Sequence, residues 1–212
     1  MLVHTQASSA ALPLYVFSTP SQLHSVNLIS WLSEEEQRQR LQRRHPNRQA
    51  EFIISRALIK KQLGLSLPQA KTMTLRLKNN YLACDNVPDT AVSLSHSHGL
   101  LAFSIYTPSK IHIGVDIELR KPRQNIAALS AAFHTSEQSH NTDTFYLRWT
   151  AKEALAKALS LPLTEILSKP TYQIMSIHRL SLCTGLLNQH RWTVAMSAGT
   201  YQEVRIHRLS LP

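Results

Sequence analysis

The chain has 212 residues, of which 43% are hydrophobic and 17% charged, and it contains only 5 glycines. This composition is typical of a globular chain with enough apolar residues for a core, and it excludes a disordered or low-complexity protein. Lys and Arg number 23 against 13 Asp and Glu, which gives a net charge of +10 and a pI near 10.0. Such an excess of positive charge predicts an anionic partner, which could be nucleic acid, an acidic protein or a phosphorylated small molecule.

The cysteines and the apolar segments bear on the cellular compartment of the protein. Cys84 and Cys183 lie one in each half without Cys-x-x-Cys spacing, so we expect reduced thiols rather than a zinc site or a redox pair. No Lys or Arg precedes the short apolar stretch near the N-terminus, which argues against a signal peptide. No window approaches the roughly 18 apolar residues that a membrane span needs. We therefore expect a cytoplasmic protein with no membrane partner.

The first half of the chain predicts two helices followed by short strands. Ser33 and Glu36 have the spacing of a capping box, which would open a helix that ends near His45-Pro46. Apolar residues at helical spacing predict a second helix over 49–63. The next segments predict extended structure, at about 73–77, 91–96 and 100–106.

The segment IHIGVDIEL (111–119) reads as an apolar strand that carries two carboxylates. Side chains alternate along a strand, so Asp116 and Glu118 share one face with His112 and Gly114, and the aliphatic residues point the other way. Gly114 leaves bare backbone on the acidic face, which gives another group room to approach closely. The alternation therefore predicts two neighbouring acids on an accessible face.

After residue 122 the pattern of the first half begins again. FHTSEQ (133–138) is similar to WLSEEEQ (31–37), and KEALAKALSLP (152–162) to SRALIKKQLGLSLP (55–68). Extended segments are expected afterwards, at about 171–177, 190–196 and 201–209. The preserved order favours an internal duplication over chance similarity between amphipathic helices. We therefore predict an α+β fold of two similar halves, 1–110 and 111–212, related by a pseudo-two-fold axis. Each half would hold helices and a small, mostly antiparallel sheet, with a ligand cleft between the halves.

A third acid, Glu153, lies on the long helix of the second half, which we predict to begin near Thr150. Taken alone, Glu153 could complete a capping box with Thr150 and form an i,i+4 ion pair with Lys157. Taken with Asp116 and Glu118, a carboxylate in the first turn of that helix predicts an oxygen cage for Mg²⁺, which favours phosphate oxygens as further ligands. Positive charge for the same phosphates would come from two lysines, Lys152 and Lys157.

GVDIE (114–118) and WTAKEALAKA (149–158) resemble the two-part signature of the 4′-phosphopantetheinyl transferases, most closely the long, two-lobed Sfp-type branch. SLSHSHG (93–99) is similar to the family's Ser-His-Ser segment, and the region 31–60 to its amino-terminal helices. The resemblance implies the family's two-lobed fold and its reaction. The phosphopantetheine arm of coenzyme A (CoA) would pass to a serine of an apo acyl or peptidyl carrier protein, with release of 3′,5′-ADP. Such carriers serve fatty acid, polyketide or nonribosomal peptide synthesis. A doubled chain with its own cleft need not dimerise, so we expect a monomer.

The resemblance also implies roles for single residues. Asp116, Glu118 and Glu153 would hold Mg²⁺ against the CoA diphosphate, and Lys157 would contact that diphosphate. Glu153 would take the proton of the carrier serine, with Glu118 as the alternative base. The other contacts with CoA would come from Ser95 and His96 near the 3′-phosphate, from Arg48 near the nucleotide, and from Lys152. Read without the resemblance, His96 could equally be a surface histidine and Lys152 could simply face solvent.

The carrier is expected to be acidic and to meet a basic surface. The first helix offers one, with Arg38, Arg40, Arg43 and Arg44. A solvated face is the default interpretation of such a set, but it would also steer an acidic carrier towards the enzyme. The segment between Lys121 and Phe145 shows no clear counterpart of the family's carrier-binding loop, so the choice of carrier stays open.

Three other interpretations compete with this one. A nucleic-acid-binding protein would explain the charge, but no helix-turn-helix, zinc-finger or RNP-like pattern is present, and aromatic residues make up only 7%. It would also leave the acidic strand face without an explanation. A basic, metal-dependent nuclease would explain both features and is the alternative enzyme. A degenerate family member that binds without turnover is disfavoured by the intact acidic set.

Overall fold

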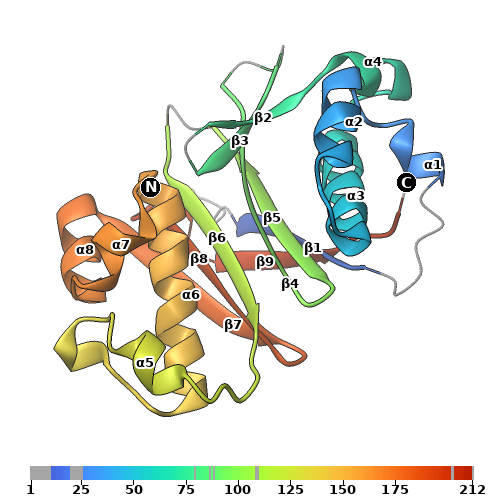
Figure 1. The fold of residues 1–212 in the computed structure, drawn as a ribbon. Helices are drawn as coiled ribbons and strands as arrows, with labels where there is room; N and C mark the ends of the chain where they lie inside the picture. The colour runs from blue at the N-terminus through green and yellow to red at the C-terminus, as the bar shows by residue number, and fades with distance from the viewer. Residues whose placement is uncertain are drawn as a thin grey trace, which may run out of the picture.

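The computed structural model describes residues 11–19, 26–78, 80–85, 87, 89–107, 110–201 and 203–211. These residues form two β-sheets covered by helices, so the predicted α+β class is confirmed (Figure 1). The larger sheet has the strand order β2-β3-β4-β5-β1-β9, and the smaller one β6-β8-β7. The strands are β1 (Ala11–Ser18), β2 (Leu75–Lys78), β3 (Tyr81–Cys84), β4 (Ala91–Ser97), β5 (Leu100–Tyr106), β6 (Ile113–Leu119), β7 (Leu180–Leu187), β8 (His190–Ser197) and β9 (Glu203–Arg208).

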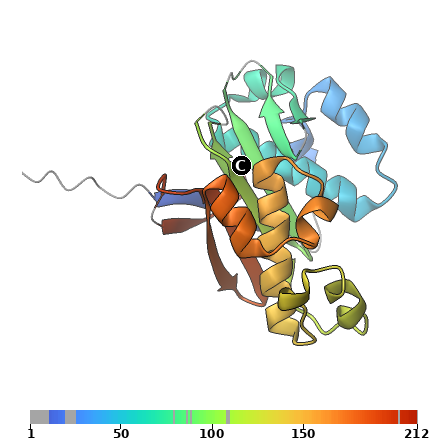
Figure 2. The same cartoon turned by 90° about the vertical axis from the view of Figure 1, so that its left-hand side faces the viewer.

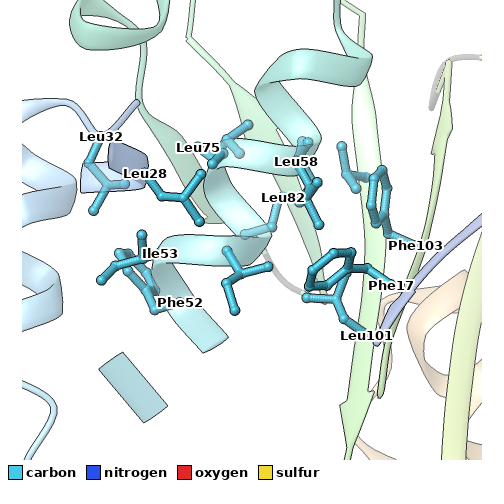
Figure 3. Packing of buried hydrophobic residues seen from close by; sticks show 14 of the residues in the cluster. Phe17, Leu28, Leu32, Phe52, Ile53, Leu58, Leu75, Leu82, Leu101 and Phe103 are labelled. Carbon is cyan, nitrogen blue, oxygen red and sulfur yellow. The ribbon is translucent and has the colours of Figure 1, made fainter. Parts of the chain in front are cut away.

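The larger sheet is covered by α3 (Pro46–Gln62), the helix predicted over 49–63. Pro46 lies in its first turn, where a missing N–H costs nothing, and Gly64 follows its end in the left-handed region (φ 73°). Between these signals the helix buries a row of apolar side chains against the strands. Figure 3 shows this core, in which Phe52, Ile53 and Leu58 of α3 meet Phe17, Leu82, Leu101 and Phe103 of the sheet. Three shorter helices lie nearby, α1 (Val26–Ile29), α2 (Glu34–Leu41) and α4 (Leu67–Thr72).

A buried ion pair ties α2 to α3. The predicted capping box is confirmed, because the Ser33 N–H donates to Glu36 Oε2 (3.0 Å) and Ser33 Oγ accepts from the Glu36 N–H (3.3 Å). Glu36 also pairs with Lys60 Nζ at 2.5 Å, with both side chains fully buried. Lys60 donates further to the Trp31 and Ala70 carbonyls, which satisfies the ammonium. Removing either charge would leave the other one buried and unpaired, so the pair fixes the helices together.

The smaller sheet is covered by α6 (Thr142–Leu159), which crosses β6 and β8 (Figure 2). The closest approach is at Gly114, where an added Cβ would lie 1.8 Å from the Ala154 carbonyl oxygen and 2.6 Å from the Ala158 nitrogen. The helix backbone therefore fills the room that this glycine was predicted to leave. Because the contact admits no side chain, α6 lies directly over the face of β6 that carries Asp116.

The start of α6 differs from the prediction by about two turns. Asn141 caps the helix by accepting from the Thr144 N–H, so Glu153 lies in the helix interior and not in its first turn. The capping box considered between Thr150 and Glu153 is wrong, because the Thr150 hydroxyl instead lies 2.8 Å from that of Thr193 on β8. The early turns of α6 have modest helix propensity and are held by tertiary packing. They belong to an aromatic cluster of Phe133, Phe145, Tyr146 and Trp149.

The region after α6 also differs from the prediction. The segment 171–177, expected to be extended, is the helix α8 (Thr171–His178), which follows α7 (Leu163–Leu167). Ile174 is its buried residue, while Tyr172 and Ile177 are exposed, so the apolar residues do not mark one clear face. The strands expected around 190–196 and 201–209 are confirmed as β8 and β9, whereas β1, β3 and β7 were not predicted. No helix among the described residues combines the length and apolar character needed to cross a membrane.

The last strand returns to the first sheet. β9 pairs in parallel with β1, with Tyr15 opposite His207. The other pairings among the described strands are antiparallel. β9 therefore belongs to the N-terminal sheet, although the expected boundary at 110/111 assigned it to the second half. The physical reason is that β1 would otherwise be an exposed sheet edge with unpaired backbone groups.

The two sheets are joined by three serine hydroxyls. Ser93, Ser95 and Ser97 alternate along β4, so all three point from one face of the larger sheet. Their oxygens accept hydrogen bonds from backbone N–H groups on the edge of β6: those of Val115 (2.8 Å), Ile117 (3.3 Å) and Leu119 (3.2 Å). Side chains of one sheet thus satisfy the backbone of the other, and we call this set the serine ladder.

Replacing Ser93 with Ala tests the ladder away from the acidic residues. We expect the free energy of unfolding to fall by about 1–3 kcal/mol, because the buried Val115 N–H loses its acceptor. Urea denaturation measures the change. Ser176→Ala, at an exposed position on α8, should stay within about 0.5 kcal/mol of the unmodified protein. Equal effects of both substitutions would show that the ladder contributes nothing to stability.

Candidate active site

The predicted acidic residues gather where β4, β6 and α6 meet. Asp116 is the most enclosed of them, at 4% exposure. Its Oδ1 atom accepts from Ser95 Oγ and from Lys157 Nζ, both at 2.8 Å. Its Oδ2 atom is buried and has no hydrogen-bond partner among the described residues. A carboxylate oxygen in this state loses hydration without compensation, which is costly unless a cation or donor joins it.

Lys157 is the residue that α6 brings to Asp116. Its ammonium also donates to the Val115 carbonyl at 2.9 Å, so it lies over the strand that holds the acid. Gly114 makes this reach possible, because it lets the turn of α6 around Ala154 and Ala158 contact β6 directly. Lys157 is therefore the cation that balances Asp116 in the structure.

The other two acids lie near Asp116 and carry unfavourable charge. Burial raises the pKa of Glu118, and the charge of Asp116 raises it further, while a hydrogen bond from Ser97 Oγ (2.7 Å) opposes the rise. Burial also raises the pKa of Glu153, with Asp116 and Glu118 adding to the effect. The Glu153 carboxylate forms no hydrogen bond or ion pair within the described part of the chain. Like charges held close in this way favour the binding of a cation.

The three acids do not form the cage that the sequence suggested. Among the described residues, no three His, Cys, Asp or Glu side chains come close enough together to surround a metal ion. Lys157 occupies the place of a cation at Asp116, so the predicted cage would require the three carboxylates to draw together when a metal ion replaces it. The donor set still fits Mg²⁺, which is commonly held by one or two carboxylates and substrate phosphates. The unpartnered Asp116 Oδ2 is the atom that fits this role best.

Lys152 lies elsewhere and does not belong to this site. Its side chain is fully buried and pairs with Glu137 at 2.7 Å, and its ammonium also donates to the Lys169 and Ile166 carbonyls. The expected contact with a phosphate and the alternative of a solvent-facing lysine are both corrected by this placement. A partner far away in the sequence accounts for the error, because Glu137 precedes α6 in the short helix η1 (Thr135–Glu137).

Ser95 is engaged in hydrogen bonds to β6. Its hydroxyl accepts from the Ile117 N–H and donates to Asp116, so both of its functions are used within the serine ladder. It is 8% exposed and lines neither of the cavities described below. The structure thus has Ser95 orient Asp116, and its place near a 3′-phosphate stays a prediction.

His96 and Arg48, both predicted to contact the nucleotide end of CoA, lie next to each other. Arg48 Nη1 lies 3.2 Å from His96 Nδ1 and 2.9 Å from Glu51 Oε2. A guanidinium can only donate, so His96 Nδ1 is the acceptor and the ring proton is on Nε2. Burial lowers the pKa of His96, which keeps this ring neutral. The two side chains converge from β4 and α3.

A cationic cavity opens next to this pair. Its volume is about 570 Å³, and Phe52, Tyr81 and Val92 form part of its apolar wall. Two guanidinium groups lie over the Phe52 ring, at 3.9 Å and 4.4 Å from its centre, and burial lowers the pKa of the second of them, Arg56, to about 10. In all, four arginines line the cavity: Arg43, Arg48, Arg56 and Arg76.

A second cavity connects the arginines with the acids. It measures about 530 Å³ and shares Arg48, Glu51 and His96 with the first. Its other walls include Glu118 and Arg123. An elongated anion can therefore reach from the arginine-lined cavity to Glu118 on β6. The volume and the mixed apolar and cationic walls suit a nucleotide-sized ligand.

Several residues of the site were not predicted for it. Arg76 and Arg123 gave no signal, because their place depends on the fold. Ser97 and Ser93 could have been found, since serines at three alternate positions of one strand must share a face. Arg43 was assigned only to a basic surface, although its guanidinium lies in the cavity over Phe52.

Comparison with known families agrees with this geometry. Residues 112–201 match the family model described as the 4′-phosphopantetheinyl transferase superfamily, ACPS. No curated protein sequence matches the chain. The matched segment contains β6, α6, β7 and β8, and with them Asp116, Glu118, Glu153 and Lys157. Residues 112–201 are therefore similar to the 4′-phosphopantetheinyl transferase superfamily domain, and this supports phosphopantetheine transfer in general.

Replacing Glu153 with Gln should stabilise the metal-free protein near neutral pH. We expect a gain of about 1 kcal/mol in the free energy of unfolding, a usual size for a stabilising substitution. The pKa of Glu153 is raised in the folded state, so its stabilising contribution is complete below the ordinary glutamate pKa of about 4.3 and is lost as the pH rises through the raised value. The gain from Glu153→Gln should therefore appear near neutral pH and vanish in acid. Urea denaturation in the presence of a chelator measures it at both pH values.

The control for this experiment is Glu165→Gln, which removes an exposed carboxylate from α7. It should leave stability nearly unchanged at either pH. A Glu153→Gln gain that persists undiminished in acid would contradict the assigned charge repulsion.

Proposed function

We propose that this protein transfers the 4′-phosphopantetheine arm of CoA to a serine hydroxyl of an apo acyl or peptidyl carrier protein, with Mg²⁺ and with release of 3′,5′-ADP. The observation that supports it most is the pair of adjoining cavities, which join four arginines to the Glu118 carboxylate of β6. CoA has the matching form, with a phosphorylated nucleotide at one end and a reactive diphosphate next to it. The superfamily match at 112–201 supports the same reaction.

The nucleotide end of CoA would occupy the arginine-lined cavity. Its anionic groups would meet Arg43, Arg48, Arg56 and Arg76, and the base would lie against the apolar wall near Tyr81. His96 at the junction of the cavities would donate from Nε2 to a phosphate oxygen, since its Nδ1 accepts from Arg48. This arrangement directs the diphosphate towards Glu118 and Asp116.

The acids and Lys157 would act at the diphosphate. Asp116, through Oδ2, would hold Mg²⁺ together with Glu118 and Glu153, and the metal would polarise the phosphoryl group and offset its charge. Lys157 would leave Asp116 and bind a diphosphate oxygen, since the metal takes over the neutralisation of the aspartate. Ser95 would keep Asp116 in place during this exchange.

The transfer itself is a displacement at the β-phosphorus. The serine oxygen forms a bond to phosphorus while the bond to the bridging oxygen of the 3′,5′-ADP portion breaks, and that leaving group takes the electron pair. The serine proton passes to a carboxylate. Glu153 is our first choice as base, because its carboxylate has no donor committed to it and its raised pKa improves proton acceptance. Glu118 is the alternative.

The nuclease alternative predicts a different partner. A duplex backbone would require basic residues spread over an open surface, whereas four of the arginines here line a cavity of about 570 Å³. The carrier protein, in contrast, has to present only one flexible serine-bearing segment. The cavity therefore favours a small anionic substrate over a polymer.

Asp116→Asn tests the proposed function directly. The unmodified protein, incubated with CoA, Mg²⁺ and a panel of apo acyl and peptidyl carrier proteins, should add one phosphopantetheine to at least one carrier, which mass spectrometry detects. Asp116→Asn should reduce the rate by roughly 100-fold or more, because the amide cannot replace an anionic metal ligand. Asp143→Asn, at an exposed acid on α6, should retain full activity. Full transfer by Asp116→Asn would refute its assignment, and Mg²⁺-dependent cleavage of nucleic acid without carrier modification would favour the nuclease.

Lys157→Met tests the exchange at Asp116. We expect Mn²⁺, used as a probe for Mg²⁺, to bind roughly tenfold more tightly to this variant in the absence of CoA. The reason is that a charge-assisted hydrogen bond to Oδ1 no longer competes for the carboxylate. Electron paramagnetic resonance of free Mn²⁺ measures the affinity. Lys61→Met, at an exposed lysine of α3, controls for net charge, and high salt removes long-range effects. Unchanged Mn²⁺ affinity in Lys157→Met would contradict the exchange.

A further inference from the structure

His98 extends the serine ladder outwards from Glu118. It lies at the turn between β4 and β5, in the sequence Ser97-His98-Gly99. Its Nδ1 atom is 3.0 Å from Ser97 Oγ, and its Nε2 atom is 2.8 Å from Lys121 Nζ. Ser97 Oγ in turn donates to Glu118 Oε2 at 2.7 Å. Four side chains thus form one hydrogen-bonded chain, from Lys121 through His98 and Ser97 to Glu118.

The donors and acceptors of these groups allow the hydrogen bonds to run in one direction, from Lys121 to Glu118. A lysine ammonium has donors only, so His98 Nε2 must accept from Lys121. The neutral ring then carries its proton on Nδ1 and donates it to Ser97 Oγ. That oxygen also accepts from the Leu119 N–H at 3.2 Å, so both of its acceptor positions are used and its single proton is left for Glu118. Burial, and then the charges of Lys121 and Arg123, lower the pKa of His98, which keeps the ring neutral.

The other tautomer of His98 would reverse the contact. A proton on Nε2 would face the N–H groups of Lys121, and Nδ1 would then be an acceptor. Ser97 would have two acceptors for one proton, namely His98 and Glu118, so Glu118 could lose its donor. The position of one ring proton therefore decides whether the Glu118 carboxylate keeps its hydrogen bond from Ser97.

The backbone conformation of the turn is a second observation that points to a role for His98. Its φ is +46°, in the left-handed region that most side chains avoid and that Asn, Asp and His enter more often than others. The next residue, Gly99, has a φ of +79°. This turn presents the imidazole to the second cavity, which His98 lines together with Glu118 and Arg123.

We propose that His98 is a positioning residue of the active site, which acts through Ser97 to hold the Glu118 carboxylate by its Oε2 atom. The proposal rests on the proposed function, in which Glu118 is a metal ligand or the base. Oε1, which has no hydrogen bond in the described part of the chain, is thereby turned to the cavity. Lys121 takes part by selecting the tautomer of His98.

The tautomer can be measured without any assumption about the reaction. In ¹⁵N-labelled protein, the imidazole nitrogen shifts of His98, assigned by comparison with a His98→Gly sample, report which nitrogen carries the proton. We expect a neutral ring with the proton on Nδ1, and Lys121→Met should shift the population towards the Nε2 form. A neutral ring with its proton on Nε2, or a charged ring at neutral pH, would overturn the proposal.

Transfer kinetics test the positioning role with matched variants. His98→Gly removes the imidazole at a φ that glycine accepts freely, and we expect kcat to fall about tenfold with little change in KM for CoA. His98→Asn should restore most of the rate, because Asn tolerates a positive φ and its amide can donate to Ser97 Oγ. Asn188→Gly, at the exposed left-handed position of the β7–β8 turn (φ 54°), controls for the backbone change. No loss in His98→Gly, or no recovery in His98→Asn, would overturn the proposal.

The two experiments separate this proposal from the proposed function. If the unmodified protein transfers no phosphopantetheine to any carrier, the proposed function fails. In that case the tautomer measurement still tests whether the hydrogen bonds from Lys121 to Glu118 run as described. If transfer occurs but the proton lies on Nε2, the proposed function stands and the role of His98 is refuted.

Discussion

The edge of β6 is the constraint on which the site depends. β8 pairs with one side of this strand, and on the other side the N–H groups of 115, 117 and 119 face the larger sheet. No strand of that sheet pairs with them, and their partners are the hydroxyls of Ser93, Ser95 and Ser97. Buried N–H groups without acceptors are costly, so these hydrogen bonds fix the position of one sheet relative to the other. The same register places Ser95 beside Asp116 and Ser97 beside Glu118, while Ser93 lies opposite Gly114, where α6 needs the space.

Each ladder serine beside an acid serves both stability and chemistry, because a hydroxyl can accept and donate at once. The acceptor side holds the sheets together, and the donor side orients a carboxylate. Gathering Asp116, Glu118 and Glu153 opposes folding, as the raised pKa values of the two glutamates indicate. Lys157 offsets part of this repulsion while no metal is bound. The energetic logic is that of many active sites, in which groups selected for function destabilise the resting protein.

Much of this arrangement could be predicted from local patterns, and the rest depends on contacts between distant segments. The period of two along 111–119 correctly gave the shared face of Asp116 and Glu118 and the close approach of another group at Gly114, since alternation is a local property of a strand. The start of α6 was missed because Phe145, Tyr146 and Trp149 form a helix through their packing with Phe133 and not through propensity. Lys152 was misplaced because its partner Glu137 lies in another element. The ladder escaped notice for the same reason, although the alternation of its serines was visible.

The predicted duplication offers an explanation for the division of labour between the two long helices. If SRALIK (55–60) is aligned with KEALAK (152–157), Arg56 corresponds to Glu153 and Lys60 to Lys157. Arg56 lines the arginine-rich cavity and Lys60 is locked to Glu36, whereas Glu153 and Lys157 lie at the acids of β6. The same i,i+4 spacing thus places a cavity-lining arginine and a buried lysine in one half, and an acid and a lysine paired with Asp116 in the other. In α6 the buried ion pair is made by Lys152 with Glu137, so under the proposed function Lys157 is left to exchange between Asp116 and a phosphate. A chain whose helices had both kept a locked lysine at that position would have no cation to exchange at the site.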